Sequence, residues 1–102
     1  MISYEVTLQL QPELAAAIED YMRRVHIPAI LATGCFQEIR LSFASPARFR
    51  TAYAAAEQAA LDRYLSDHAA AFRADFLERF PDGVTVTRQT WVQREMWSAY
   101  VS

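Results

Sequence analysis

The sequence predicts an α+β fold in which a four-stranded antiparallel sheet carries its helices on one face. The chain has 102 residues, the size of a single domain, and 53% of them are hydrophobic against 22% charged, so it can bury a core. Apolar residues recur with a period of two in four segments, as in half-buried strands. Between the first two segments, and again between the last two, the apolar spacing is helical.

The first strand is followed by a helix. Residues 2–10 alternate between apolar and polar side chains, which predicts a strand with one buried face. Pro12 and Glu13 are typical of a first helical turn, where a missing N–H is tolerated and an acid is favoured. The helix is expected to end near His26, because Pro28 disfavours helical geometry in the residue before it. The expected apolar stripe of this helix consists of Leu14, Ile18, Tyr21 and Val25.

Two strands joined by a short connection come next. Residues 36–43 and residues 48–54 both alternate between apolar and polar side chains. Residues 44–47, Ala-Ser-Pro-Ala, are typical of a hairpin connection. The lone Cys35, at the turn that enters the first of these strands, is interpreted as a small core residue rather than a nucleophile.

A second helical region and a last strand complete the pattern. The helix is expected to begin at about Ala55 and to break at residues 66–67, Ser-Asp, which are good N-cap residues for a second piece. Residues 81–83, Pro-Asp-Gly, are typical of a helix stop, and residues 84–92 alternate as a strand. The resulting order is that of the split βαβ unit, a ferredoxin-like βαββαβ sandwich formed by one domain over residues 1–102.

Helices can cover only one face of such a sheet. The opposite face contains Trp91, and residues 93–102 form an apolar C-terminal tail. We therefore expect two sheets to pack face to face as a homodimer, a dimeric α+β barrel, with Trp97 and Tyr100 of the tail buried against the partner chain. The alternative is a solvated face with an exposed tryptophan. The face is expected to carry Ser3, Glu5, Thr7, Gln9, Glu38, Arg40, Ser42, Thr85, Thr87, Gln89 and Trp91.

The charges of that face are expected to pair between the two subunits of the dimer. The pairs would join Glu5 or Glu38 of one chain to Arg40 or Arg88 of the other.

Composition excludes several classes of function. Ten basic residues against twelve acidic ones give a net charge of −2, which argues against nucleic acid or a membrane surface as partner. All ten basic residues are arginine, so lysine-dependent chemistry is excluded, and two glycines are too few for a phosphate-binding loop. One cysteine provides neither a disulfide framework nor a multi-thiolate zinc site. No apolar run is long enough for a membrane span and no signal peptide is recognised, so a cytoplasmic location is expected.

The two histidines, His26 and His68, are the candidate catalytic residues. The topology brings the end of the first helix and the second helical piece to the same end of the sheet, where two imidazoles beside Asp67 could act as an acid–base pair. The alternative is structural, with one histidine as a helix C-terminal cation and the other as a partly buried hydrogen-bonding group. A metal would need a third ligand from Asp67, Glu38 or Cys35. We expect neither a metal nor a cofactor.

Four residues on the predicted strands are candidates for binding a small molecule. They are three aromatic side chains and one guanidinium that could anchor an anion: Tyr4, Tyr53, Trp91 and Arg40. Two functions remain open. The first is a small-molecule-binding barrel, with or without cofactor-independent chemistry. The second is a non-catalytic dimerisation or protein-interaction module that uses the apolar tail.

Two blocks of sequence resemble a known family. Residues 21–36, YMRRVHIPAILATGCF, and residues 64–81, from YLSDHA through LERFP, are similar to the bacterial family called domain of unknown function 4286. The similarity extends to about residue 92 and departs from the family pattern at Ala70, where proline is usual. The resemblance implies a ferredoxin-like, dimeric α+β barrel and implies no activity.

A wider likeness rests on the histidine-x-proline near the end of the first helix. In this feature the chain is similar to antibiotic-biosynthesis monooxygenases and EthD-type barrels. The likeness implies a site for small, often aromatic compounds between the sheet and the helices, and some of these barrels need no cofactor.

Overall fold

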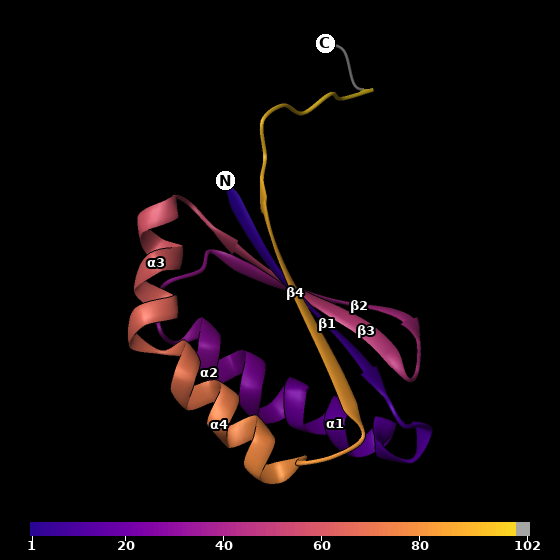
Figure 1. The fold of residues 1–102 in the computed structure, drawn as a ribbon. Helices are drawn as coiled ribbons and strands as arrows, with labels where there is room; N and C mark the ends of the chain where they lie inside the picture. The colour runs from indigo at the N-terminus through magenta and orange to yellow at the C-terminus, as the bar shows by residue number, and fades with distance from the viewer. Residues whose placement is uncertain (100–102) are drawn as a thin grey trace.

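The computed structural model describes residues 1–99 of the chain. It contains four strands and a set of helical segments that alternate along the chain as Figure 1 shows. In order, they are β1 (Ile2–Leu10), η1 (Pro12–Leu14), α1 (Ala15–Tyr21), η2 (Met22–His26), α2 (Ile27–Leu31), β2 (Glu38–Ser45), β3 (Arg48–Ala55), α3 (Gln58–Asp67), α4 (Ala69–Arg79) and β4 (Val84–Val92).

The strands form one antiparallel sheet in the order β2-β3-β1-β4. Leu8 of β1 lies opposite Phe49 of β3 and Val86 of β4, so apolar side chains of the three strands meet on one face. The helices cover that face and leave the other uncovered (Figure 1). The α+β class and the ferredoxin-like topology predicted from the sequence are confirmed.

The first helix continues past His26, where the sequence analysis ended it. Residues Met22–His26 form a π-helical turn closed by a bond from the Ile27 N–H to the Met22 carbonyl, and α2 then carries Pro28 in its first turn. Proline is tolerated there because the backbone N–H groups of a first helical turn have no carbonyl partner within the helix, so the missing N–H of proline costs no hydrogen bond. The wider turn also shifts the buried stripe. Met22 is 2% exposed, whereas the predicted stripe residue Val25 is 38% exposed.

The second helical region breaks at His68, not at Ser66 and Asp67 as predicted. His68 has φ −127° and ψ −36°, between α3 and α4. The Ser66 hydroxyl donates to Asp67 Oδ1 at 2.9 Å, so these two side chains bond to each other instead of capping α4. Ala55, predicted to start this helix, is the last residue of β3.

The interior consists of two groups of buried side chains between the sheet and the helices. One surrounds Tyr4 and Tyr53 and includes Cys35, and the other surrounds Leu8 and Phe49. Helices in the described part of the chain are all too short or too polar to cross a membrane.

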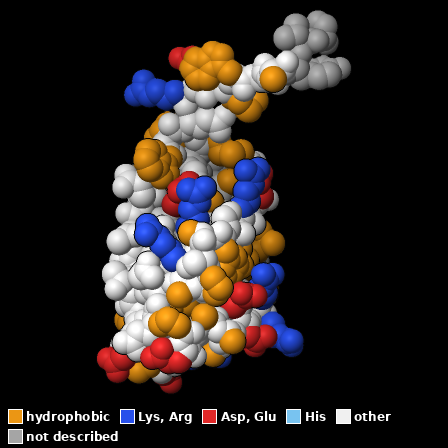
Figure 2. Space-filling model, turned by 90° about the vertical axis from the view of Figure 1, so that its right-hand side faces the viewer, with side chains coloured by type: hydrophobic (Ala, Val, Ile, Leu, Met, Phe, Trp, Pro, Cys, Tyr) orange, Lys and Arg blue, Asp and Glu red, His pale blue; other side chains and the backbone are white. Residues whose placement is uncertain are grey.

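The helix-free face of the sheet is turned toward the viewer in Figure 2, where acidic and basic side chains lie side by side on it. The two acidic side chains that were expected to pair between subunits have partners within the chain. Glu5 pairs with Arg50 at 3.6 Å, diagonally across two strands, and Glu38 pairs with Arg40 at 2.7 Å. Trp91 is 56% exposed on this face.

The chain leaves β4 as an extended segment that points away from the body of the molecule (Figure 1). Met96 and Trp97 in this segment are 79% and 83% exposed. Tyr100, also expected in the partner contact, lies outside the described residues.

Candidate functional site

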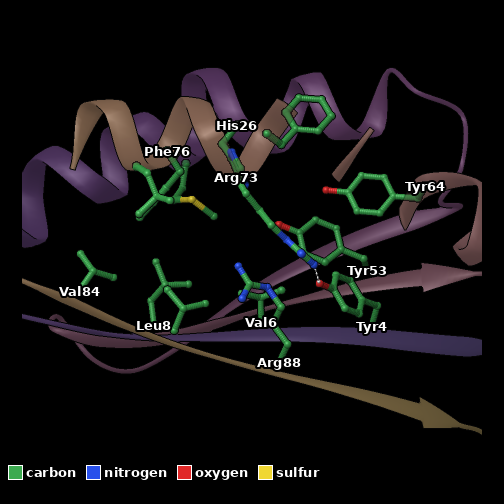
Figure 3. Close-up of a pocket in the computed structure, with 14 residues that line it drawn as sticks. Tyr4, Val6, Leu8, His26, Tyr53, Tyr64, Arg73, Phe76, Val84 and Arg88 are labelled. Carbon is green, nitrogen blue, oxygen red and sulfur yellow. Dashed lines mark hydrogen bonds between the residues drawn. The ribbon is translucent and has the colours of Figure 1, made fainter. Parts of the chain in front are cut away.

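A cavity of about 430 Å³ lies between the helical layer and the sheet (Figure 3). Its floor is formed by β1, β3 and β4, and its roof by η2, α3 and α4. Most of the wall is apolar or aromatic. The lining residues are Tyr4, Val6, Leu8, Met22, His26, Tyr53, Tyr64, Phe72, Arg73, Phe76, Leu77, Val84, Val86 and Arg88.

Two guanidinium groups converge at the mouth of this cavity. Arg73 reaches down from α4 and Arg88 reaches up from β4, as Figure 3 shows. Arg73 Nη2 donates a hydrogen bond to the Tyr4 hydroxyl at 3.0 Å. Among residues 1–99, no Asp or Glu lines the cavity, and no ion pair involves either arginine. The cavity therefore carries two uncompensated positive charges against an apolar wall.

Local structure explains why both arginines face inward. The period of two along β4 places Arg88 on the same side as Val84 and Val86, the side that faces the helices. On α4, Arg73 precedes the buried Phe76 by three residues and so shares its face. The site is thus assembled from residues far apart in the chain, on two elements that flank the cavity.

Tyrosine hydroxyls add neutral polar groups to the wall. The Tyr4 ring lies 6.0 Å from the Tyr53 ring and 6.3 Å from the Tyr64 ring, centroid to centroid. Burial raises the pKa of Tyr64 to about 12 and also raises the pKa of Tyr53. Both therefore stay protonated at neutral pH and can donate hydrogen bonds.

His26 lies in the wall of the cavity and is linked to Tyr21 and Asp75. The Tyr21 hydroxyl donates to Asp75 Oδ2 at 2.5 Å, and the Tyr21 oxygen lies 3.4 Å from His26 Nδ1. The Arg79 guanidinium stacks 4.7 Å above the Tyr21 ring and lies 3.4 Å from Asp75 Oδ2.

This arrangement sets the protonation of the three groups. Burial lowers the pKa of His26 from 6.5 to about 4, and the Asp75 charge opposes that effect only in part. Burial, together with the bond to Asp75, raises the pKa of Tyr21, and the same bond lowers the pKa of Asp75. At neutral pH the imidazole is neutral, the phenol is protonated and the carboxylate is charged.

Three of the six candidate site residues from the sequence line the cavity: His26, Tyr4 and Tyr53. The other three lie elsewhere. His68 stacks on Tyr64 at 6.3 Å but does not line the cavity with His26.

Arg40, the predicted anion anchor, and Trp91 also lie outside the cavity. Arg40 is exposed on β2 and paired with Glu38, and Trp91 is on the helix-free face. The alternation of β2 and β4 directs both side chains away from the helices.

The sequence analysis missed Arg73 and Arg88 as site residues. For Arg88 a signal was present, because its place in the alternation of residues 84–92 puts it on the apolar side of the strand. For Arg73 the signal was its spacing from Phe76 in the helix. Within residues 1–99, no three His, Cys, Asp or Glu side chains form a group that could hold a metal ion.

A family model described as "Domain of unknown function (DUF4286)" matches residues 1–93. The chain belongs to this family. No curated protein matches the chain.

Several solved structures share the fold of this DUF4286 protein. HapK from Hahella chejuensis is 16% identical with a TM-score of 0.69, and the match covers 100% of this chain and 99% of that one. A candidate antibiotic biosynthesis monooxygenase from Deinococcus radiodurans is 17% identical with a TM-score of 0.67, over 99% and 100% of the two chains. A protein of unknown function from Nitrosomonas europaea is 18% identical with a TM-score of 0.65, over 96% and 95%. At such identities the likeness shows the fold alone.

Proposed function

We propose that this protein binds a small anionic molecule with an aromatic or aliphatic body in the cavity between sheet and helices. The observation that carries this proposal is the convergence of Arg73 and Arg88 on a cavity wall that has no carboxylate among residues 1–99. Guanidinium groups match carboxylate and phosphate oxygens in geometry as well as in charge. Like charges that face each other without a counterion favour an anion between them.

The rest of the cavity suits the body of such a ligand. A volume of about 430 Å³ is within the range of small-molecule sites, and Val6, Phe72 and Val86 offer apolar contacts. The Tyr64 hydroxyl supplies a neutral donor. Both arginines are more than a third exposed, so the charged end of the ligand would lie at the open mouth of the cavity.

Phenylacetate and its neutral isostere phenylacetamide test the proposal. We expect phenylacetate to shift the NMR signals of Val6 and Val86, and phenylacetamide to do so at least about tenfold more weakly. Arg73→Met and Arg88→Met should each weaken phenylacetate binding about tenfold or more, because each removes a charged hydrogen-bond donor. Arg63→Met is the matched control, since Arg63 is an exposed arginine of α3 outside the cavity. Equal binding of acid and amide, or an equal loss in all three variants, would contradict the proposal.

A second proposal concerns the homodimer, and it rests on the exposed apolar tail. We propose that Trp97 and Met96 bury their side chains against a second copy of the chain, together with Trp91 and Val92 at the end of β4. Exposed aromatic residues in an extended segment are typical of such contacts.

Deleting residues 96–102 tests the dimer. We expect the full chain to sediment as a dimer and the shortened chain as a monomer. A full-length monomer would contradict the dimer proposal, and an unchanged dimer after the deletion would contradict the role of the tail.

A further inference from the structure

The hydrogen-bond chain from Asp75 through Tyr21 to His26 determines which imidazole nitrogen carries the hydrogen. Asp75 is a carboxylate, so it only accepts, and the single proton of the Tyr21 hydroxyl is directed to it. The Tyr21 oxygen can then only accept from His26 Nδ1. Nδ1 is therefore protonated, and the lone pair of the neutral ring is on Nε2.

The ring of His26 lies where its lone pair can reach a molecule bound in the cavity. His26 lines the cavity, and its ring is held by edge contacts with Phe72 and Phe76 at 5.9 and 6.1 Å between centroids. Nδ1 is engaged with Tyr21, and within residues 1–99 no hydrogen bond involves Nε2, so this nitrogen can accept a proton.

We infer that His26 is the proton acceptor in a reaction on a carbon acid held by Arg73 and Arg88, with Tyr21 and Asp75 as its positioning residues. This inference rests on the proposed anion site. The substrate class is a carboxylate with an adjacent ketone and an apolar body, such as an arylpyruvate. One guanidinium would take the carboxylate and the other the ketone oxygen.

The step is a proton transfer that needs no oxidant. His26 Nε2 takes a proton from the carbon beside the ketone, and the C–H electron pair becomes the C=C bond of an enolate. The π pair of the ketone moves to its oxygen, where a guanidinium stabilises the negative charge. The Asp75 carboxylate, acting through Tyr21, offsets part of the cost that burial places on the imidazolium until its proton returns to the same carbon or to another atom of the enolate.

The tautomer of His26 is a direct test of the positioning residues. In protein labelled with ¹⁵N at histidine, we expect long-range ¹H–¹⁵N correlations at neutral pH to show a protonated Nδ1 and an unprotonated Nε2. Asp75→Asn, a change at a half-exposed side chain, should shift His26 toward the Nε2-protonated form that predominates in free imidazoles. Glu78→Gln removes a charge from the same helix and should leave the tautomer unchanged. An unprotonated Nδ1 in the unaltered protein would overturn the inference.

Phenylpyruvate tests the reaction itself. We expect the protein to accelerate exchange of its methylene hydrogens for deuterium in D₂O, followed by ¹H NMR. His26→Gln should lower this acceleration about a hundredfold or more while phenylpyruvate still binds. Glu78→Gln should retain both exchange and binding.

The outcomes separate the two proposals. Binding of phenylpyruvate without accelerated exchange would overturn the role of His26 and leave the anion site standing. Absence of phenylpyruvate and phenylacetate binding would overturn the anion site, and the proton transfer with it.

Discussion

Burial of the His26 ring beside Phe72 and Phe76 penalises its charged form more than the nearby Asp75 carboxylate favours it. The folded protein therefore takes up a proton at His26 only near pH 4, whereas the unfolded chain takes it up near pH 6.5. Between these values the unfolded state binds more protons, so stability falls as the pH is lowered through this window. The cavity keeps an unprotonated imidazole at neutral pH at the cost of acid stability.

This residue-scale effect predicts a measurable loss of stability in acid. Between about pH 7.5 and about pH 4.5, we expect His26 to cost the protein about 2 kcal/mol of unfolding free energy in urea titrations. His26→Gln should remove most of that dependence, because glutamine does not titrate. The lowered pKa of Asp75 acts in the same direction but only at lower pH, in the range where carboxylates titrate. An unaltered slope in His26→Gln would show that the histidine is not the cause.

Single residues also show where sequence reasoning about the site succeeds. Tyr4 and Tyr53 could be predicted because alternation along a strand determines which face a side chain occupies. The same alternation directs the Arg88 side chain toward the cavity and the Arg40 side chain toward solvent. Arg40 was selected for its chemistry alone, which is why its position outside the cavity was not foreseen.

At the scale of elements, a short turn connects α4 and β4, the two elements that carry Arg73 and Arg88. Gly83 in this turn has φ +82°, and a Cβ there would lie 2.8 Å from Leu14 Cδ1. The Gln11 N–H also donates to the Gly83 carbonyl at 2.9 Å. The turn is therefore packed against η1, and only glycine fits it without strain.

The two glycines of the chain provide a matched comparison. Gly34 has a similar φ of +77° but open space around it. We expect Gly34→Ala to cost about 1 kcal/mol from backbone strain alone, and Gly83→Ala to cost about 2 kcal/mol or more because the new methyl group also displaces Leu14. Thermal and urea unfolding of the two variants measure the difference. Equal costs would mean that Leu14 moves aside freely.

The helical elements show the limit of local rules. A proline at residue 28 predicts a helix end near His26, and the chain instead inserts a π-helical turn and continues to Leu31. The π turn keeps Tyr21, Met22 and His26 all on the side of the sheet, which a continuous α-helix with 3.6 residues per turn does not predict. Local propensity identified the perturbing residue, and packing against the sheet determined how the helix accommodates it.

At the scale of the whole molecule, the cavity and the tail lie apart. The lining residues lie between the sheet and the helices, and the tail projects from the end of β4 opposite to the turn at Gly83 (Figure 1). The chain shortened by residues 96–102 should therefore bind phenylacetate with unchanged affinity even when it is monomeric. A loss of affinity on shortening would mean that the partner chain completes the cavity.

The sequence by itself determined the four strands, the covered face of the sheet and the ferredoxin-like order, because alternation and helical spacing are local properties of the chain. It also placed Tyr4 and Tyr53 on the strand faces that point inward, and it singled out His26 without predicting that its side chain faces the sheet. Only the tertiary structure decided that Arg73 and Arg88 meet across a cavity, and that Tyr21 joins His26 to Asp75, which is 54 positions after Tyr21. These contacts depend on the distances between the sheet and the helices and between one helix and another. The periodicity of a sequence contains no information about those distances.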